Sequence, residues 1–370
     1  MKIVYLHSGR LPTEKAHGYQ IMKMCEAFVS LGHEVLLLTA HRETLPGEND
    51  PFQYYGIRKI FSIRRVPVIN LVNAVPKFGS WLLQIGFLFM AKIYLVFHRY
   101  DLLYLREHMS GLFFRDFILE VHSLPAEIRS RDLRVWRRAK KIVTLTSFVK
   151  NSLAEAGVPG DKVMVAADAV DLATFDTEMA KAEARQRLGL PTDKKIIGYT
   201  GSFRTLQMDK GISAILKALP QIPDAIFVAV GGSRPDIDHY QKEAAANGVA
   251  ERVLLLPRAD LDKLAVYQKA FDVLMMPFPR TKHYEYYMSP LKMFEYMAAK
   301  RPIVASDLPS VREVLNDDNA IIVEPDNAAA LAAGVLRVLR DEDLAKRISQ
   351  QAFADVKLFT WKNRAKMILS

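Results

Sequence analysis

The chain of 370 residues is poor in cysteine and contains only Cys25. One cysteine can form neither an internal disulfide bond nor a cysteine zinc cluster, so we expect a reducing compartment. Only four apolar residues, Ile3 to Leu6, precede the first polar stretch. They are too few for the apolar part of a signal peptide, and together the two observations favour a cytoplasmic protein.

Long apolar runs are also scarce. The most apolar window, Trp81–Phe97, has 17 residues and contains Gln84 and Lys92. A membrane-spanning helix needs about 20 apolar residues, so we expect no transmembrane span here. The alternatives are a helix packed in the core and a helix lying at a membrane surface.

Half of the whole chain is hydrophobic, which excludes a disordered protein.

Acidic residues are absent from residues 51–100, which hold seven basic ones, including Arg58, Lys59, Arg64 and Arg65. Residues 1–150 contain 22 basic and 12 acidic residues, whereas residues 151–370 contain 29 of each. The net charge of +10 therefore belongs entirely to the first part of the chain. Such a surplus attracts phosphate groups of nucleic acid, anionic lipid or a phosphorylated substrate.

Metal-binding patterns are not evident. The nine histidines show no paired ligand spacing. Three Asp-x-Asp stretches resemble a metal-binding motif, at Asp236–Asp238, Asp260–Asp262 and Asp341–Asp343. Each lies where a helix is expected to begin, and acidic residues favour the positive end of a helix dipole. We therefore predict no metal site.

Short apolar runs alternate with segments of helical periodicity along the whole chain. The expected strands of the first series are Lys2–Leu6, Glu34–Leu38, Leu102–Leu105, Phe117–Val121 and Lys141–Leu145. Those of the second are Lys195–Tyr199, Ala225–Val230, Arg252–Leu256, Val273–Met276, Pro302–Ala305 and Ala320–Val323. This alternation predicts an α/β protein with two doubly wound, Rossmann-like domains, divided near residue 175. Since parallel sheets bind ligands at the carboxyl ends of their strands, we expect a cleft between the two sheets.

A glycine turn follows the first strand of the second series. Gly201 and Ser202 come directly after the expected strand, and Lys210-Gly211 precedes a helix over Ile212–Leu219. Backbone N–H groups at a helix N-terminus, with a nearby lysine, suit a diphosphate. A tight turn with a solvated lysine is the alternative.

A second helix start is expected at Ser289-Pro290-Leu291-Lys292. Ser289 is a plausible N-cap with Pro290 at the first helical position. A lysine in the first turn opposes the helix dipole unless an anionic ligand lies there. Glu295, one to two turns in, could accept hydrogen bonds from both ribose hydroxyls of a nucleotide. A charged, half-buried helix face is the alternative.

This second block strongly resembles the C-terminal signature of retaining, family-4-type glycosyltransferases with the GT-B fold. Other stretches agree in order: Gly32-His33-Glu34-Val35, Val121-His122, Ala167–Asp171, Thr200–Gly211, Tyr267–Val273 and Phe359-Thr360-Trp361. The resemblance implies an N-terminal acceptor-binding domain over residues 1–175 and a nucleotide-sugar-binding domain over residues 176–356. It also implies that a last helix, about residues 357–370, packs back onto the first domain.

The resemblance also assigns roles to individual residues. Lys210 is similar to the lysine at the donor diphosphate, Glu295 to the glutamate that holds the ribose, and His122 to the histidine beside the scissile bond. Gly18 lies where a family glycine admits the phosphates, and Arg258-Ala259 where backbone reads the base. Glu120, two residues before His122, points to the same side of its strand and could orient it.

Two positions depart from the family pattern. The first glutamate of the Glu-x7-Glu motif is Tyr287 here, and Glu285 could replace it from another register. The arginine that usually follows the loop glycine is Ser202, and Arg204 could replace it.

The resemblance thus implies sugar transfer from a nucleotide diphosphate to a lipid-linked or polysaccharide acceptor, with retained configuration and neither metal nor cofactor. The candidate catalytic residues are His122, Lys210 and Glu120. We interpret the basic surplus around Arg58 and Arg64 as an acceptor-side or membrane-docking surface. A nucleotide-sugar epimerase of the same fold is the alternative, and the absence of a helix-turn-helix or an aromatic RNA-binding motif argues against nucleic acid.

Overall fold

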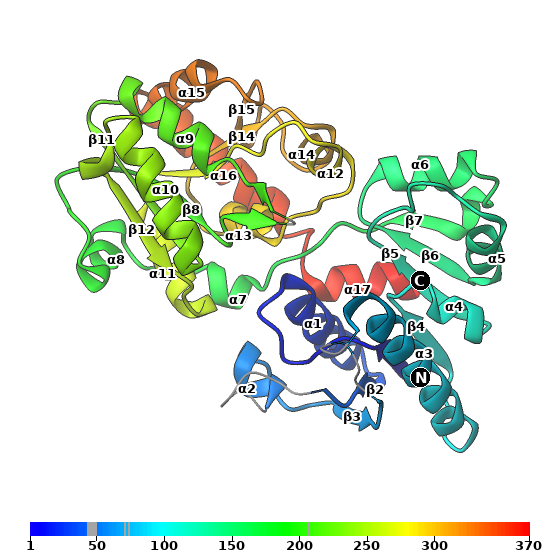
Figure 1. The fold of residues 1–370 in the computed structure, drawn as a ribbon. Helices are drawn as coiled ribbons and strands as arrows, with labels where there is room; N and C mark the ends of the chain where they lie inside the picture. Colours follow the sequence, from blue (N-terminus) through cyan, green and yellow to red (C-terminus); the bar gives the residue numbers. More distant parts are fainter. Residues whose placement is uncertain (43–49, 70–71, 73–74, 206) are drawn as a thin grey trace. The chain divides into compact units, whose positions relative to one another are not determined.

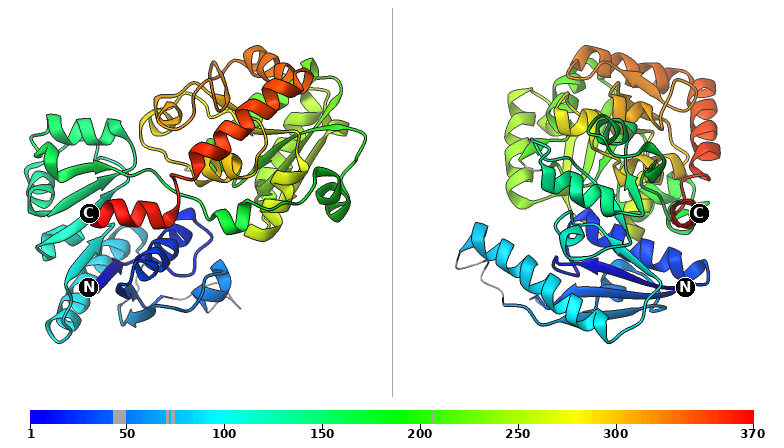
Figure 2. Two further views of the ribbon diagram at one scale, coloured as in Figure 1. Left: turned by 180° about the vertical axis from the view of Figure 1, so that it is seen from behind. Right: turned by 90° about the vertical axis from the view of Figure 1, so that its right-hand side faces the viewer.

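The computed structural model describes residues 1–42, 50–69, 72, 75–205 and 207–370. These residues form two compact units (Figure 1). Unit 1 comprises residues 1–168 and 361–370, and unit 2 comprises residues 169–360. The chain passes from unit 1 to unit 2 after Asp168 and returns to unit 1 after Thr360. The expected boundaries, after residues 175 and 356, differ from these by seven and four residues. Each unit contains one parallel sheet with helices on both faces (Figures 1 and 2), which confirms the predicted fold class.

The sheet of unit 1 has seven strands in the order β3-β2-β1-β4-β5-β6-β7, and all its neighbouring strands are parallel. The strands are β1 (Lys2–His7), β2 (Glu34–Ala40), β3 (Ser62–Val66), β4 (Leu102–Leu105), β5 (Phe117–Val121), β6 (Lys141–Thr144) and β7 (Val163–Val165). Strands β1, β4 and β5 lie at the centre and are buried almost throughout, as their continuous apolar sequences predict. The sequence analysis missed β3 and β7, which form the two edges.

Seven α-helices of unit 1 are described. They are α1 (Ala16–Ser30), α2 (Pro51–Tyr55), α3 (Pro76–Val96), α4 (Ser110–Phe113), α5 (Ser130–Arg138), α6 (Ser147–Glu155) and α17 (Trp361–Leu369). Helix α17 packs on α1 although more than 300 residues separate them in sequence (Figure 1). The Trp361 ring meets the Tyr19 ring edge-on, with 6.2 Å between the centroids.

Helix α3 is longer than the expected 17-residue window. It runs over 21 residues, and its segment Phe78–Val96 is long and apolar enough to cross a membrane by length and composition alone. The length argument against a span was therefore wrong. One face of the helix is buried through Leu83, Phe87, Leu88 and Ala91, and a third of the apolar segment is inside the unit. The opposite face exposes Trp81, Phe89, Ile93 and Val96.

The sheet of unit 2 has six parallel strands in the order β12-β11-β8-β13-β14-β15. They are β8 (Lys195–Thr200), β11 (Ala225–Gly232), β12 (Val253–Pro257), β13 (Val273–Met276), β14 (Ile303–Ser306) and β15 (Ile321–Val323). A short antiparallel hairpin, β9 (Arg204–Thr205) and β10 (Met208–Asp209), follows β8. All six sheet strands were predicted to within two residues at either end.

The helices of unit 2 cover both faces of this sheet (Figure 2). They are α7 (Leu172–Phe175), α8 (Lys181–Leu188), α9 (Ile212–Ala218), α10 (Arg234–Ala246), α11 (Leu261–Ala270), α12 (Lys282–Tyr286), α13 (Leu291–Ala298), α14 (Pro309–Arg312), α15 (Ala328–Arg340) and α16 (Glu342–Val356). The three Asp-x-Asp stretches lie at the starts of α10, α11 and α16, as predicted. Asp341 accepts a hydrogen bond from the backbone N–H of Leu344, as an N-cap does.

Candidate functional site

The carboxyl end of β8 in unit 2 is shaped by glycines. Gly201 and Gly231 have φ angles of +108° and +125°, and a Cβ at Gly231 would lie 2.5 Å from the Gly201 carbonyl oxygen. Gly211, the N-cap of α9, has φ +98° and leaves no room for a Cβ beside the Pro277 carbonyl. Only glycine fits these positions, so two backbone turns converge where β8 meets α9.

Lys292 lies directly behind Gly201. Its side chain is 8% exposed, and its Nζ has no hydrogen-bond partner among the described residues. The Nζ lies 3.4 Å from the centroid of the Tyr199 ring, and its Cε and Nζ would contact a Cβ at Gly201. Burial and the neighbouring charge of Lys210 hold the pKa of Lys292 well below its usual range. A buried ammonium without a partner is costly, and an anion at Gly201 would remove that cost.

Lys210 lies on the other side of the same turn, just before Gly211. Its Nζ donates a hydrogen bond of 2.8 Å to the Oγ of Ser202. Burial lowers the pKa of Lys210 to about 8, and Lys210 in turn helps to lower the pKa of His283. The structure therefore brings together Gly201, Ser202, Lys210 and Lys292, which were all predicted donor residues, and adds His283, which was not.

Glu295 lies one turn further along α13 than Lys292 and accepts a hydrogen bond from a buried glutamine, Gln268. The Nε2 of Gln268 on α11 donates to Glu295 at 3.2 Å and to the Oγ1 of Thr200 at 3.0 Å. Burial raises the pKa of Glu295 to about 7. Gln268 thus links the carboxylate to the end of β8. Sequence reasoning quoted Gln268 within a family stretch but gave it no role.

The start of α13 differs from the prediction in one detail. The N-cap is Pro290, with extended backbone at ψ 128°, and Leu291 is the first helical residue. The prediction of Ser289 as N-cap and Pro290 as first helical residue was wrong by one position. Ser289 is buried and precedes the cap. Because proline fixes only its own φ, it fits the cap position as well as the first turn. Lys292 still lies in the first turn, as expected.

Other predicted donor residues have partners elsewhere. The Nε of Arg204 donates to the Tyr240 hydroxyl at 3.3 Å and lies 3.7 Å from Asp236, so its guanidinium faces α10. Glu285 on α12 forms an ion pair of 3.6 Å with Arg280. Arg258 and Ala259 follow β12, with Arg258 exposed. None of these contacts joins Arg204 or Glu285 to Lys292.

In unit 1, His122 follows β5 and Glu120 is fully buried below it. The Nε2 of His122 donates to Glu120 at 2.6 Å, and Arg106 approaches the Nδ1 at 3.4 Å. Burial and Arg106 lower the pKa of His122 to about 4, although Glu120 opposes the shift. The ring is therefore neutral near pH 7, and both of its nitrogens face partners within unit 1. The predicted orienting contact of Glu120 is present.

Glu120 is the centre of a buried network. Burial alone would raise its pKa, but Arg364 and the hydrogen bond from His122 hold the pKa well below its usual range. Arg364, on α17, lies 3.4 Å from Glu120 and donates to the carbonyl of Ala167 at 2.9 Å. The Tyr104 hydroxyl also donates to Glu120. Sequence reasoning missed Arg364 and Tyr104, because nothing local indicates that α17 reaches β5.

Gly18 lies in the first turn of α1. A Cβ there would lie 2.0 Å from the Tyr55 hydroxyl, which bonds both the N–H and the carbonyl of Thr13. The packing of Tyr55 therefore accounts for this glycine within unit 1. Its predicted part in phosphate binding stays a prediction.

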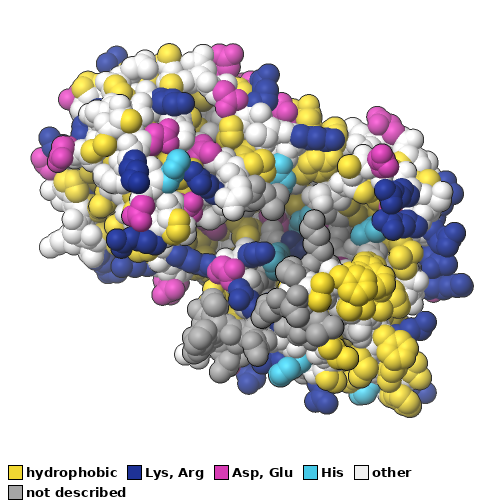
Figure 3. Space-filling model, in the orientation of Figure 1, with side chains coloured by type: hydrophobic (Ala, Val, Ile, Leu, Met, Phe, Trp, Pro, Cys, Tyr) yellow, Lys and Arg dark blue, Asp and Glu magenta, His cyan; other side chains and the backbone are white. Residues whose placement is uncertain are grey.

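The basic residues singled out in unit 1 lie around its edge strand. Arg58 and Lys59 are exposed just before β3, Arg64 is exposed within it, and Arg65 reaches the Leu11 carbonyl at 3.4 Å. Figure 3 shows a hydrophobic patch over α3 with basic side chains close by. The exposed apolar residues of this helix are Phe78, Trp81, Phe89, Ile93 and Val96.

Within the described part of the chain, no group of three or more His, Cys, Asp or Glu side chains is arranged to hold a metal ion. The geometry of unit 2 instead presents two lysines, two glycine turns and a carboxylate at one end of a parallel sheet. This set suits an anion attached to a hydroxyl-bearing group.

Two family models match the chain in succession. Residues 18–174 match "Glycosyltransferase Family 4", and residues 194–341 match "Glycosyl transferases group 1". Together they cover most of both units.

Curated relatives and solved structures agree with these matches. A D-inositol 3-phosphate glycosyltransferase of Xylanimonas cellulosilytica is 31% identical over 66% of this chain and 61% of its own length. The chain therefore spans less than two thirds of that relative. Sucrose-phosphate synthase of Thermosynechococcus elongatus superposes with a TM-score of 0.75 at 21% identity, covering 99% of this chain and 97% of the other. Anabaena HepE in complex with UDP-glucose gives a TM-score of 0.72 at 18% identity, covering 100% and 98%.

Proposed function

Since the chain belongs to the family-4-type glycosyltransferases with the GT-B fold, we propose that it transfers a sugar from a nucleotide diphosphate to a hydroxyl of a lipid-linked or glycan acceptor. The observation that carries this proposal is the buried Nζ of Lys292 behind the Gly201 turn, which has no hydrogen-bond partner in the part of the chain that the structure describes. Such a cation is stabilised by a strongly anionic ligand, and a nucleotide sugar supplies one in its diphosphate.

The donor is held at its diphosphate and at its ribose in this proposal. Lys292 and Lys210 neutralise the diphosphate together with the N-terminus of α13, and Glu295 accepts hydrogen bonds from the ribose hydroxyls. HepE, a structural neighbour, is described in complex with UDP-glucose, which supports a nucleotide sugar as the ligand. The proposal does not specify which base and which sugar the donor carries.

The chemical step follows from where the cations lie. As the bond between the anomeric carbon and the diphosphate oxygen breaks, negative charge grows on that oxygen, and Lys210 and Lys292 stabilise it. The acceptor hydroxyl attacks from the same face, and its proton passes to the departing diphosphate, so the configuration is retained. His122 has no free nitrogen to take this proton, because Glu120 and Arg106 face both of them. We propose that Glu120 and Arg106 hold the His122 ring in place within unit 1, and the scheme uses no metal or cofactor.

The acceptor side is proposed to lie in unit 1, at the cytoplasmic face of a membrane. The exposed apolar face of α3 and the basic residues Arg58, Lys59 and Arg64 support this placement, because apolar and cationic side chains together favour an anionic lipid surface.

The decisive test is the variant Lys210→Ala, assayed for release of nucleotide from a panel of nucleotide sugars. We expect activity to fall by about 10²- to 10³-fold, the loss typical of removing one group that stabilises a developing negative charge. Lys217→Ala is the matched control, because Lys217 is exposed on the next helix and should keep full activity. Unchanged activity of Lys210→Ala would refute the assignment. Consumption of donor without acceptor, giving an epimerised nucleotide sugar, would favour an epimerase.

A further inference from the structure

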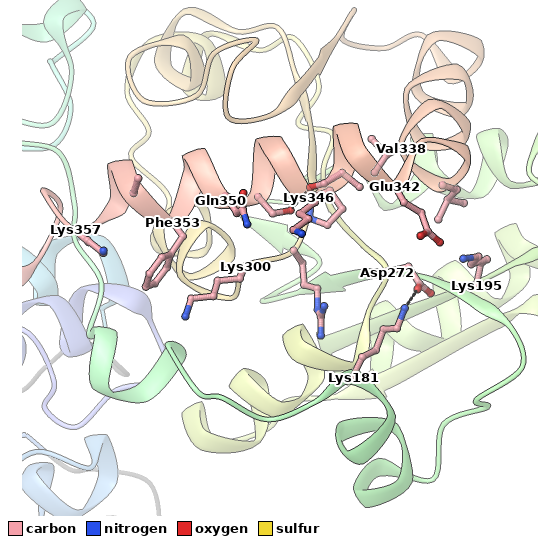
Figure 4. Close-up of a pocket in the computed structure, with 16 residues that line it drawn as sticks. Lys181, Lys195, Asp272, Lys300, Val338, Glu342, Lys346, Gln350, Phe353 and Lys357 are labelled. Atoms are coloured by element: carbon pink, nitrogen blue, oxygen red, sulfur yellow. Dashed lines mark hydrogen bonds and ion pairs between the residues drawn. The ribbon is translucent and has the colours of Figure 1, made fainter.

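Unit 2 has a second basic region at the opposite end of its sheet. A cavity of about 790 Å³ lies where β8, β13 and β14 begin, and α16 forms its other wall (Figure 4). Lys195 is the first residue of β8, whereas Gly201 follows its last. At about 3.3 Å per residue, the six steps from Lys195 to Gly201 place the start of β8 about 20 Å from the Gly201 turn.

The lining of this cavity is strongly cationic. Six of its residues are basic, namely Lys181, Lys195, Lys300, Arg301, Lys346 and Lys357, and only Asp272 and Glu342 are acidic. Asp272 is already neutralised within the unit, at 2.6 Å from Lys181 and 2.5 Å from Arg185. Its carboxylate also acts on Arg301, where it opposes the lowering of the pKa by burial, so one carboxylate is shared among several cations.

Three of the lining cations form no ion pair with the described residues, and these are Lys195, Arg301 and Lys346. Arg301 donates its Nε and Nη2 to the Lys269 carbonyl, which leaves its Nη1 available to a ligand. The side chains of Lys346 and Gln350 extend from α16 toward the same space (Figure 4). The local positive charge also acts on its surroundings, because burial, Lys300 and Arg301 lower the pKa of Lys269 to about 8.

The cavity also has an apolar wall, formed by Pro302, Val338, Leu339 and Phe353. Lys300 lies 4.0 Å from the centroid of the Phe353 ring. The volume falls within the range of about 300–1,000 Å³ that is usual for small-molecule sites, which favours a small ligand over a macromolecule. An apolar wall beside unpaired cations suits an organic group that carries a phosphate.

We propose that this cavity, at the amino end of the sheet of unit 2, binds a small organic phosphate monoester separately from the nucleotide sugar. Lys195, Arg301 and Lys346 hold the phosphate, and the Val338–Leu339 wall contacts the organic group. The proposal does not depend on glycosyl transfer, since it concerns binding at the other end of the strands.

The first experiment maps lysine reactivity by mass spectrometry, using an amine-reactive label on the unaltered protein with and without phenyl phosphate. We expect phenyl phosphate to lower the labelling of Lys195 and Lys346 at least threefold and to leave the exposed Lys217 and Lys242 unchanged. Phenol, which lacks the phosphate, should protect none of them. Equal labelling of Lys195 and Lys346 with and without phenyl phosphate would overturn the proposal.

The second experiment measures phenyl phosphate binding by calorimetry. The double variant Lys195→Glu/Lys346→Glu should bind at least tenfold more weakly, whereas the matched double variant Lys217→Glu/Lys242→Glu should bind normally. Lys210→Ala, which alters the Gly201 turn, should also bind normally. Loss of binding in Lys210→Ala alone would place the ligand at the Gly201 turn and overturn a separate site.

Discussion

Two buried charged groups, Glu120 in unit 1 and Lys292 in unit 2, differ in whether the fold supplies their partners. In unit 1, Glu120 is surrounded by Arg364, His122 and Tyr104, so the network is complete without a ligand. In unit 2, Lys292 is also buried but has no hydrogen-bond partner among the described residues. This difference in partners indicates two different roles for the two buried groups. The network of unit 1 fixes a histidine in place, whereas the cation of unit 2 is left to be neutralised by what binds.

The largest expected effect comes from breaking the complete network. Arg364→Met removes the cation beside Glu120 and leaves a buried carboxylate without its main partner. We expect the free energy of unfolding, measured by urea denaturation, to fall by about 3–5 kcal/mol. Arg347→Met is the control, since Arg347 is exposed on α16. An unchanged midpoint would show that Arg364 does not stabilise unit 1.

The same kind of change should have the opposite effect on stability in unit 2. Lys292→Met removes a buried amino group whose Nζ has no hydrogen-bond partner among the described residues, so we expect the melting temperature to rise by about 2–4 °C, which corresponds to about 1 kcal/mol. Transfer activity should meanwhile fall by about 10²-fold because the diphosphate loses a cation. A variant that is both less stable and fully active would contradict the contrast between the units.

The pH dependence of donor binding should be set by titrating groups of unit 2 alone. Glu295, with a pKa raised to about 7, becomes protonated as the pH falls and then accepts ribose hydroxyls poorly. Lys210, with a pKa lowered to about 8, loses its charge as the pH rises. We therefore expect 1/KM for the donor to peak between pH 7 and 8 and to fall about tenfold per pH unit beyond each side.

Glu295→Gln is the control for this profile, because it cannot titrate and should remove the acidic limb. His122 and Glu120 contribute nothing in this range, since the pKa of each is lowered by its surroundings. A profile with a limb near pH 4 would instead point to the histidine of unit 1.

The smallest effect is expected at the surface of unit 1. Phe89→Glu/Ile93→Glu replaces two exposed residues of α3, so the fold should persist while sedimentation with anionic liposomes falls several-fold. Leu358→Glu is the matched control, because Leu358 is exposed in unit 2. If neither protein sediments with liposomes, the apolar face of α3 does not bind lipid.

Much of this architecture could be predicted from the sequence. The central strands are continuous apolar runs, and parallel strands buried on both faces need such runs. The edge strands β3 and β7 were not predicted, because their sequences lack the continuous apolar runs of the central strands. Strand β3 contains Arg64 and Arg65, and β7 has only three residues, so neither shows a clear apolar pattern. The length of α3 was underestimated because its first turns, from Pro76, precede the apolar window.

The candidate site was predictable where its residues are close in sequence. Lys210, Lys292 and Glu295 lie beside glycines or helix starts, which are local signals. Gln268 and Arg364 act through contacts that join distant segments, so only the fold reveals them. The prediction for Arg204 rested on sequence proximity to Gly201, but its guanidinium bonds Tyr240 instead.

The position of Arg364 also constrains how the protein is made. Residues 361–370 complete unit 1, yet the ribosome synthesises them only after all of unit 2. Until then Glu120 lacks Arg364 and has only the partners that the earlier residues supply, among them Arg106, His122 and Tyr104. During synthesis the network around His122 therefore cannot be completed until every residue of unit 2 has been made.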